Sequence, residues 1–147
     1  MRRPIVLAFI VALTVLMAGC APATVGNGFA ADLTASAEFP APTLDGATPS
    51  GSATAVLDSA NNTLTLSGTF SGLTGPATGA HIHGPAGVGE TAGVLFPLQV
   101  DTAASGSISG TWTDMTAEQV RQLRDGLYYV NIHTEMNAAG EIRGQLR

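Results

Sequence analysis

The chain has 147 residues, with eleven acidic side chains and six basic ones, so its formal net charge at pH 7 is −5. This balance repels phosphate backbones, which excludes a nucleic-acid-binding protein. Cys20 is the single cysteine, which excludes a disulfide within the chain.

The first 19 residues have the three parts of an export signal. Arg2 and Arg3 are followed by an apolar run from Ile5 to Ala18 and by small residues before Cys20. The run is too short for a membrane-spanning helix, which needs roughly 20 apolar residues. We therefore expect residues 1–19 to be a signal peptide that is removed during export.

The end of this segment, Leu16-Met17-Ala18-Gly19-Cys20, resembles the lipobox of bacterial lipoproteins. The resemblance implies that the Cys20 thiol carries a diacylglycerol, with fatty acids such as palmitate. Two acyl chains hold a protein stably at a membrane. Ala21 stands where an aspartate would act as a retention signal, so we expect an outer-membrane lipoprotein facing the periplasm, or a cell-surface lipoprotein in another envelope. An ordinary secretory signal with an incidental thiol is the alternative.

The remaining chain is predicted to form one all-β domain. Residues 20–31 are small and polar, as expected for the lipid anchor and a flexible spacer, and the domain is expected to span residues 32–147. Residues 53–57 and 63–70 are predicted to pair as a hairpin, with Asn61-Asn62 at the turn. Further strands are predicted at residues 79–83, 94–98, 107–112, 128–134 and 141–146.

One short helix interrupts the strand pattern. Thr116 to Gln119 match a capping box, Val120 and Leu123 give an apolar stripe, and Gly126 ends the segment. Trp112, just before it, is expected in the core. Short strands with a single helix favour a Greek-key β-sandwich.

The three histidines are expected to lie together on one face. His81 and His83 alternate with Ile82, and His133 alternates with Ile132, so the apolar residues face the core and the imidazoles face outward. If the two strands are neighbours, the three rings meet. Three imidazoles with an open position suit copper or zinc. The arrangement resembles the copper ligands of copper-zinc superoxide dismutases, but the chain lacks a bridging histidine and a second cluster. Histidines that hydrogen-bond and fix the loop at residues 84–89 are the alternative.

The sequence gives no sign of an enzyme. It has no Gly-x-Ser-x-Gly motif, and the single cysteine is assigned to the anchor, so no nucleophile is visible. Glu135 and Glu141 flank a turn and are interpreted as solvated residues rather than a catalytic pair. Glu141 and Arg143 share a strand face and are expected to form a surface ion pair.

Several strings together resemble the CHRD domain family, named after chordin. They are Ala37-Glu38-Phe39-Pro40-Ala41-Pro42, Ala80-His81-Ile82-His83-Gly84-Pro85-Ala86, Leu123 to Gly126, Tyr128-Tyr129-Val130-Asn131-Ile132-His133-Thr134 and Gly140-Glu141-Ile142-Arg143-Gly144-Gln145-Leu146. The resemblance implies an immunoglobulin-like or superoxide-dismutase-like sandwich.

Two functions follow as expectations. The favoured one is a non-catalytic binding or structural module at the cell envelope, which takes a protein or small ligand through its loops and its histidine-bearing face. The alternative is a copper-binding or zinc-binding protein that uses His81, His83 and His133. Both differ from the growth-factor antagonism of chordin, which is an extracellular protein with repeated copies of the domain.

Overall fold

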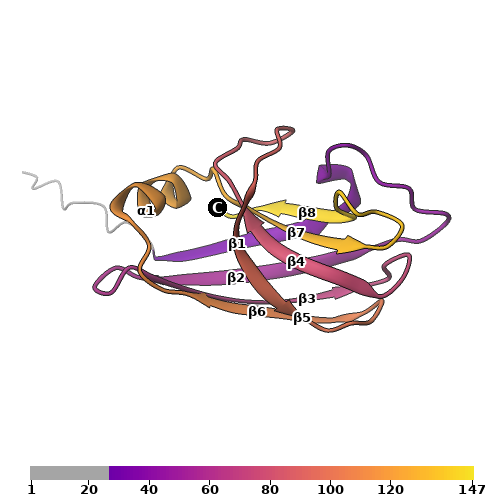
Figure 1. The fold of residues 1–147 in the computed structure, drawn as a ribbon, viewed down its shortest axis with the longest axis horizontal. Coiled ribbons are helices and arrows are strands. Elements are labelled where there is room, and N and C mark those ends of the chain that lie inside the picture. Colours follow the sequence, from indigo (N-terminus) through magenta and orange to yellow (C-terminus); the bar gives the residue numbers. More distant parts are fainter. Residues whose placement is uncertain (1–26) are drawn as a thin grey trace, which may run out of the picture.

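The computed structural model describes residues 27–147 (Figure 1). The predicted signal peptide, Cys20 and most of the predicted spacer lie outside the described residues. The elements are β1 (Gly28–Thr34), a 3-10 turn η1 (Ala35–Ala37), β2 (Ser50–Asp58), β3 (Thr63–Ser71), β4 (Ala77–His83), β5 (Val94–Val100), β6 (Gly106–Trp112), α1 (Ala117–Arg124), β7 (Tyr129–Thr134) and β8 (Ile142–Gln145).

The strands form one closed antiparallel barrel in the order β1-β2-β3-β6-β5-β4-β7-β8. The ring closes between β1 and β8, where Thr34 pairs with Arg143 and Ala30 exchanges two backbone hydrogen bonds with Arg147. A Cβ at Gly144 would lie 2.4 Å from the Asp32 carbonyl oxygen, so a glycine there lets the two backbones approach. The predicted all-β fold with one short helix is confirmed. A Greek-key sandwich is not confirmed, because the strands form a single closed sheet.

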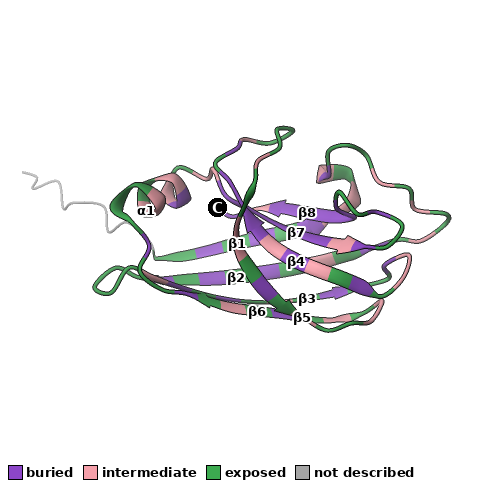
Figure 2. Cartoon of the chain, viewed as in Figure 1, coloured by how far each residue is buried: buried purple, intermediate pink, exposed green. Residues whose placement is uncertain are grey.

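The interior of the barrel is filled by alternate residues of each strand. On β3, Leu64, Leu66 and Phe70 are buried while the residues between them are largely exposed, as the period-two pattern predicts. The β2–β3 hairpin is confirmed, with Asn62 at a φ of 50° in its turn. Figure 2 shows the buried positions recurring along the strands.

The core includes residues that lie before the predicted start of the domain. β1 begins at Gly28, whereas the sequence places the domain start at Asp32. Phe29 and Ala31 point inward with Leu33, and β1 pairs with β2 along its whole length. The segment is small and polar on average, but Phe29, Ala31 and Leu33 occupy alternate positions in it and form the inward face of a strand.

The helix α1 and the only tryptophan lie at one end of the barrel. The capping box is confirmed, because the Thr116 hydroxyl accepts from the Gln119 N–H and the Gln119 side chain accepts from the Thr116 N–H. Trp112 is 9% exposed and stacks against Phe96 and Tyr128, which confirms its predicted place in the core.

The outer face of β7 and β8 is also covered, so most residues of these strands are buried on both faces (Figure 2). Two segments cover it: the loop between β4 and β5, residues 84–93, and the segment after η1, residues 38–49. The first is tied to Arg143 and Gln145 of β8, and the second is tied to Asn137 through Thr43. Polar side chains therefore lie in a second buried layer outside the barrel. No helix in the described part of the chain is long and apolar enough to cross a membrane.

Candidate metal centre

The three histidines come together on the outer face of two neighbouring strands. β4 pairs with β7, with Gly79 opposite His133 and His81 opposite Asn131. Ile82 and Ile132 point into the core, each about 1% exposed or less. The predicted meeting of the three imidazoles is confirmed; their role as metal ligands stays a prediction.

The ring nitrogens are close enough to share one ion. One nitrogen from each of His81, His83 and His133 lies within 4.8 Å of the others. The ring centroids of His81 and His133 are 4.9 Å apart, and that of His83 lies 5.6 and 5.8 Å from them. The closest approach joins His81 Nδ1 to His133 Nε2 at 3.0 Å. Among the described residues, these three form the cluster best suited to a metal ion.

Two backbone carbonyls fix which nitrogen of each ring can bind. His83 Nδ1 lies 3.0 Å from the Ala92 oxygen, and His133 Nδ1 lies 3.1 Å from the Ala138 oxygen. A carbonyl oxygen can only accept, so both Nδ1 atoms carry the proton and both Nε2 atoms keep a lone pair, which in His133 accepts from His81 Nδ1. His83 Nε2 is buried and has no hydrogen-bond partner in the described structure. This is the arrangement that orients histidine ligands of metals.

The histidines are held in the neutral form that metals require. Burial lowers the pKa of His133 to about 4, and the neighbouring rings of His81 and His83 add to the effect. Burial also lowers the pKa of His81 and His83, although the hydrogen bond to Ala92 acts in the opposite direction for His83. A neutral imidazole at pH 7 offers its lone pair without first losing a proton.

Two stacked side chains, Tyr129 and Arg143, support His83. The ring of Tyr129 lies parallel to that of His83, with centroids 5.0 Å apart and an angle of 8° between the planes. The Arg143 guanidinium lies 3.5 Å from the centroid of the Tyr129 ring. The Tyr129 hydroxyl accepts from the Ala92 N–H at 3.1 Å, so the residue that orients His83 is itself held in place.

The predicted surface ion pair between Glu141 and Arg143 is wrong. Both side chains are buried, at 0% and 1% exposed, and they have different partners. Arg143 donates to the Glu90 and Gly87 carbonyls and to Gln145, so it binds the β4–β5 loop. The loop covers the strand face that the sequence pattern alone leaves open to solvent.

Glu141 is the centre of a second polar cluster and not a solvated turn residue. It accepts hydrogen bonds from the backbone and hydroxyl of Thr74, from the Thr134 hydroxyl and from the Asn137 amide. Burial acts to raise its pKa, but these hydrogen bonds outweigh it and lower the pKa. Glu135 is exposed, so the two carboxylates form no pair.

Beside the histidines lies a third buried polar group. Asn131 donates to Glu38 Oε1 at 3.4 Å, and both Glu38 Oε2 and Asn131 Oδ1 are buried with no partner in the described structure. Burial raises the pKa of Glu38, against the effects of the Phe39 N–H and the Arg143 charge. Gly140, at a φ of 137°, leaves room for both side chains.

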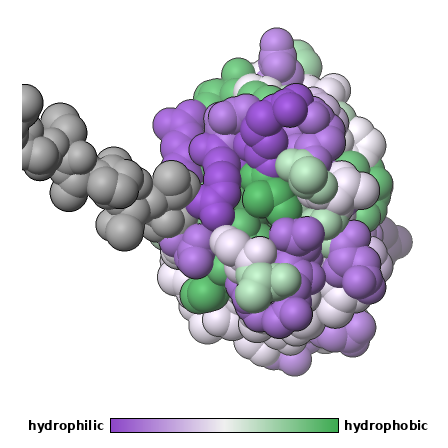
Figure 3. Space-filling view, turned by 90° about the vertical axis from the view of Figure 1, so that its left-hand side faces the viewer, coloured by the Kyte–Doolittle hydropathy of each residue, from purple (hydrophilic) through white to green (hydrophobic). Residues whose placement is uncertain are grey.

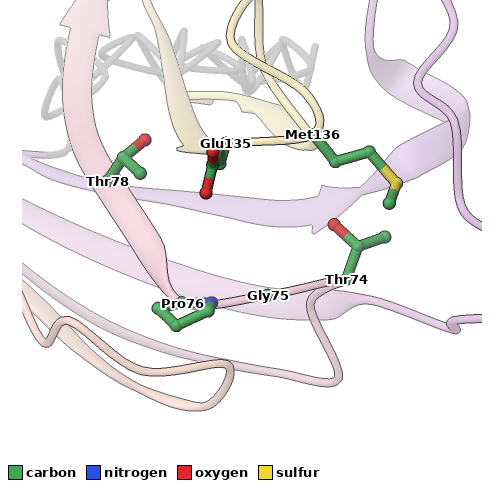
Figure 4. A pocket seen from close by; sticks show the side chains of 6 residues that line it. All are labelled: Thr74, Gly75, Pro76, Thr78, Glu135 and Met136. Carbon is green, nitrogen blue, oxygen red and sulfur yellow. The ribbon is translucent and has the colours of Figure 1, made fainter.

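A surface hollow of about 380 Å³ lies next to this region but does not include the histidines. Figure 4 shows Thr78 of β4 and Glu135 after β7 on one side, and the segment from Thr74 to Pro76 on the other, with Met136 beside it. Glu135 is the only titratable residue of its lining. The hollow therefore carries no set of groups for acid–base or nucleophilic catalysis.

The predicted residues omit the supports of the site. Tyr129, Arg143 and Ala92 each act on His83, yet only the histidines are predicted as candidates. The signal for Tyr129 is present, because Tyr129, Asn131 and His133 alternate on β7 and so share the outward face. Ala92 gives no such signal, since it contributes a backbone carbonyl from a loop.

Comparison with known families supports the resemblance in the sequence. The model of the CHRD domain matches residues 29–146, nearly the whole chain and all the strands described above. Searches of curated proteins and of solved structures return no match.

Proposed function

The chain belongs to the CHRD domain family, and on that premise we propose that it is a binding module of the cell envelope whose ligand is a copper or zinc ion. His81, His83 and His133 are the proposed ligands. Family membership supports a binding or structural module, and the histidine cluster supports the choice of ligand.

The observation that carries the proposal is the pair of oriented histidines. His83 and His133 each use Nδ1 for a backbone carbonyl and leave Nε2 for an ion. Two nitrogens bound tetrahedrally to one zinc ion are roughly 3.3 Å apart, since each bond is about 2.0–2.1 Å. The separation of 3.0 Å between His81 and His133 is close to this value. Binding therefore requires small side-chain movements and a shift of the His81 proton from Nδ1 to Nε2.

A fourth position at the ion is accessible from solvent. His81 and His133 are partly exposed, whereas His83 is 8% exposed. A three-histidine site with one open position can exchange its ion or accept a small exogenous ligand. We propose metal binding at this cluster and no catalytic step.

The test is metal stoichiometry and affinity of the purified protein, loaded separately with copper and zinc. We expect one tightly bound ion in the native chain and none in the His81→Ala/His133→Ala double variant. Thr78→Ala, an exposed substitution on the same strand, is the matched control and should bind like the native chain. Circular dichroism checks that the variants are folded. Equal binding by native protein and double variant would refute the proposal.

We also propose that the module is attached to a membrane by lipid on Cys20. Asn27 is held at the α1 end of the barrel by Ser59 and Arg124, and the chain from Cys20 to Asn27 can span at most about 25 Å. Figure 3 views this end, where hydrophilic residues surround a small hydrophobic area. Such a surface supports attachment through the lipid with this end toward the membrane.

Lipidation is tested by expression in a bacterial host with labelled palmitate. We expect the native chain to carry the label and to be found in the membrane fraction. The Cys20→Ser variant should carry no label and should not be found in the membrane fraction. A labelled Cys20→Ser variant, or an unlabelled native chain, would contradict the anchor and leave the metal site unaffected.

A further inference from the structure

Arg143 carries a buried positive charge that no carboxylate neutralises by direct contact. Its guanidinium donates to the carbonyl oxygens of Glu90 and Gly87 at 2.6 and 2.9 Å and to the side-chain oxygen of Gln145 at 3.3 Å. All three acceptors are uncharged. The ion pair of Arg121 with Glu118 lies on α1 and does not involve Arg143. A buried cation without a counter-ion acts over a longer distance than one in solvent.

The ring of Tyr129 lies between the Arg143 guanidinium and the histidine cluster. The guanidinium is 3.5 Å from the centroid of the Tyr129 ring, and this centroid is 5.0 Å from that of His83. The intervening material is an aromatic ring and not water.

Glu38 is an acidic side chain that the charge of Arg143 reaches, because that charge lowers its pKa, although burial raises it overall. It follows η1 and bonds to Asn131, which stands between His81 of β4 and Arg143 of β8 in the strand register. The Arg143 guanidinium, in contrast, is joined to the histidine cluster by ring contacts, because it lies over Tyr129 and Tyr129 stacks on His83.

We infer that Arg143 makes the three-histidine site select copper in its +1 state over divalent copper and zinc. The inference rests on the proposed function, since it concerns the ion that the same site binds. Three neutral imidazoles leave the full charge of a bound ion uncompensated. A nearby cation then disfavours a divalent ion more strongly than a monovalent one. At a separation of about 10 Å and an effective dielectric constant of about 20, the extra unit of charge lowers affinity about tenfold.

Arg143 is thus a tuning residue that acts through Tyr129 and is not itself a ligand. Zinc and Cu²⁺ both suit imidazole ligands, and Cu²⁺ is generally bound more tightly than Zn²⁺ by such sites. Geometry alone therefore does not favour the monovalent ion here. The selection comes from the buried charge, which makes it testable by substitution.

The experiment compares the affinities of the full-length purified protein for Cu⁺, Cu²⁺ and Zn²⁺. Each is measured by competition with a chromophoric chelator, with Cu⁺ kept under anaerobic ascorbate. We expect the native protein to bind Cu⁺ more tightly than Cu²⁺. In Arg143→Met the ratio of the two affinities should shift about tenfold toward Cu²⁺. In Arg143→Lys, which keeps the charge but loses the paired hydrogen bonds, the ratio should stay near the native value.

The outcomes separate the inference from the proposed function. If no ion binds in any state, the metal site itself is refuted. If ions bind but the native protein prefers Cu²⁺, or Arg143→Met leaves the ratio unchanged, the inference alone is overturned. If Arg143→Met does not fold, Arg143→Gln replaces it, because it is also neutral but keeps hydrogen-bond donors, and the same shift of about tenfold toward Cu²⁺ is expected.

Discussion

His81 Nδ1 lies 3.0 Å from His133 Nε2, across two strands that are hydrogen-bonded to each other. Because the Ala138 carbonyl occupies the other nitrogen of His133, the proton between the rings belongs to His81. The contact is therefore a directed hydrogen bond, and its acceptor is a lone pair that a metal ion would use.

This assignment predicts the tautomers of the metal-free protein. We expect nitrogen NMR to find all three histidines neutral at pH 7, each protonated at Nδ1. Metal binding requires His81 to change, because its Nδ1 proton faces the site. On addition of zinc, the His81 signals should switch to the Nε2-protonated form while His83 and His133 keep their tautomers. A metal-free His83 protonated at Nε2 would contradict the hydrogen bond to Ala92.

Tyr129 is predicted to affect metal affinity in two separable ways. Tyr129→Phe removes only the hydroxyl that accepts from Ala92, so affinity should fall about fivefold, the equivalent of one hydrogen bond of about 1 kcal/mol. Tyr129→Leu also removes the stack against His83 and should cost between about tenfold and a hundredfold. Titration of both variants checks the order. Native affinity in Tyr129→Leu would show that the stack does not position His83.

Glu141 is predicted to stabilise the fold in a pH-dependent way. Glu141→Gln replaces an acceptor of several hydrogen bonds and should lower the free energy of unfolding by about 1–3 kcal/mol at pH 7. The pKa of Glu141 is lowered from 4.5, so its contribution is complete above pH 4.5 and is lost as pH falls through the folded-state pKa. Urea unfolding curves of native protein and variant should therefore converge in acid. Glu135→Gln, at an exposed position, is the control.

Gly140 is predicted to be intolerant of a side chain. A Cβ there would lie 2.4 Å from both Asn131 Oδ1 and Glu38 Oε2, and the φ of 137° disfavours other residues. Gly140→Ala should lower the free energy of unfolding by about 2–4 kcal/mol. Gly75→Ala is the matched control, because a Cβ at Gly75 meets nothing within 4 Å. Equal stability of the two variants in urea would refute the close packing.

The parts of the fold that depend on local pattern could be predicted from the sequence. The alternation of Leu64, Leu66 and Phe70 gives the strand and its inward face, and the Thr116 capping box gives the start of the helix. The outward position of the histidines follows from Ile82 and Ile132 in the same way. These features are set by residues near one another in the chain.

The features that could not be predicted depend on loop segments, in which apolar and polar residues follow no regular pattern. The loop at residues 84–93 turns Arg143 from an expected surface residue into a buried one, and the segment that contains Thr74 does the same for Glu141. Closure of the sheet depends on strand neighbours that are far apart in sequence, such as β1 and β8. The hydrogen bond from His83 to a backbone carbonyl also could not be predicted, because every residue type has a carbonyl group.

Closure of the barrel also affects whether copies of this protein aggregate with one another. Each strand of the described barrel has a hydrogen-bonded neighbour on both sides, so no strand is an edge strand along its whole length, and even β5 and β6 pair at Gln99–Ser109 and Val100–Ile108. An exposed edge can pair with the edge of another copy and begin aggregation. Lipid anchoring would confine many copies to one surface at high local concentration. A closed barrel can tolerate that crowding without polymerising strand to strand.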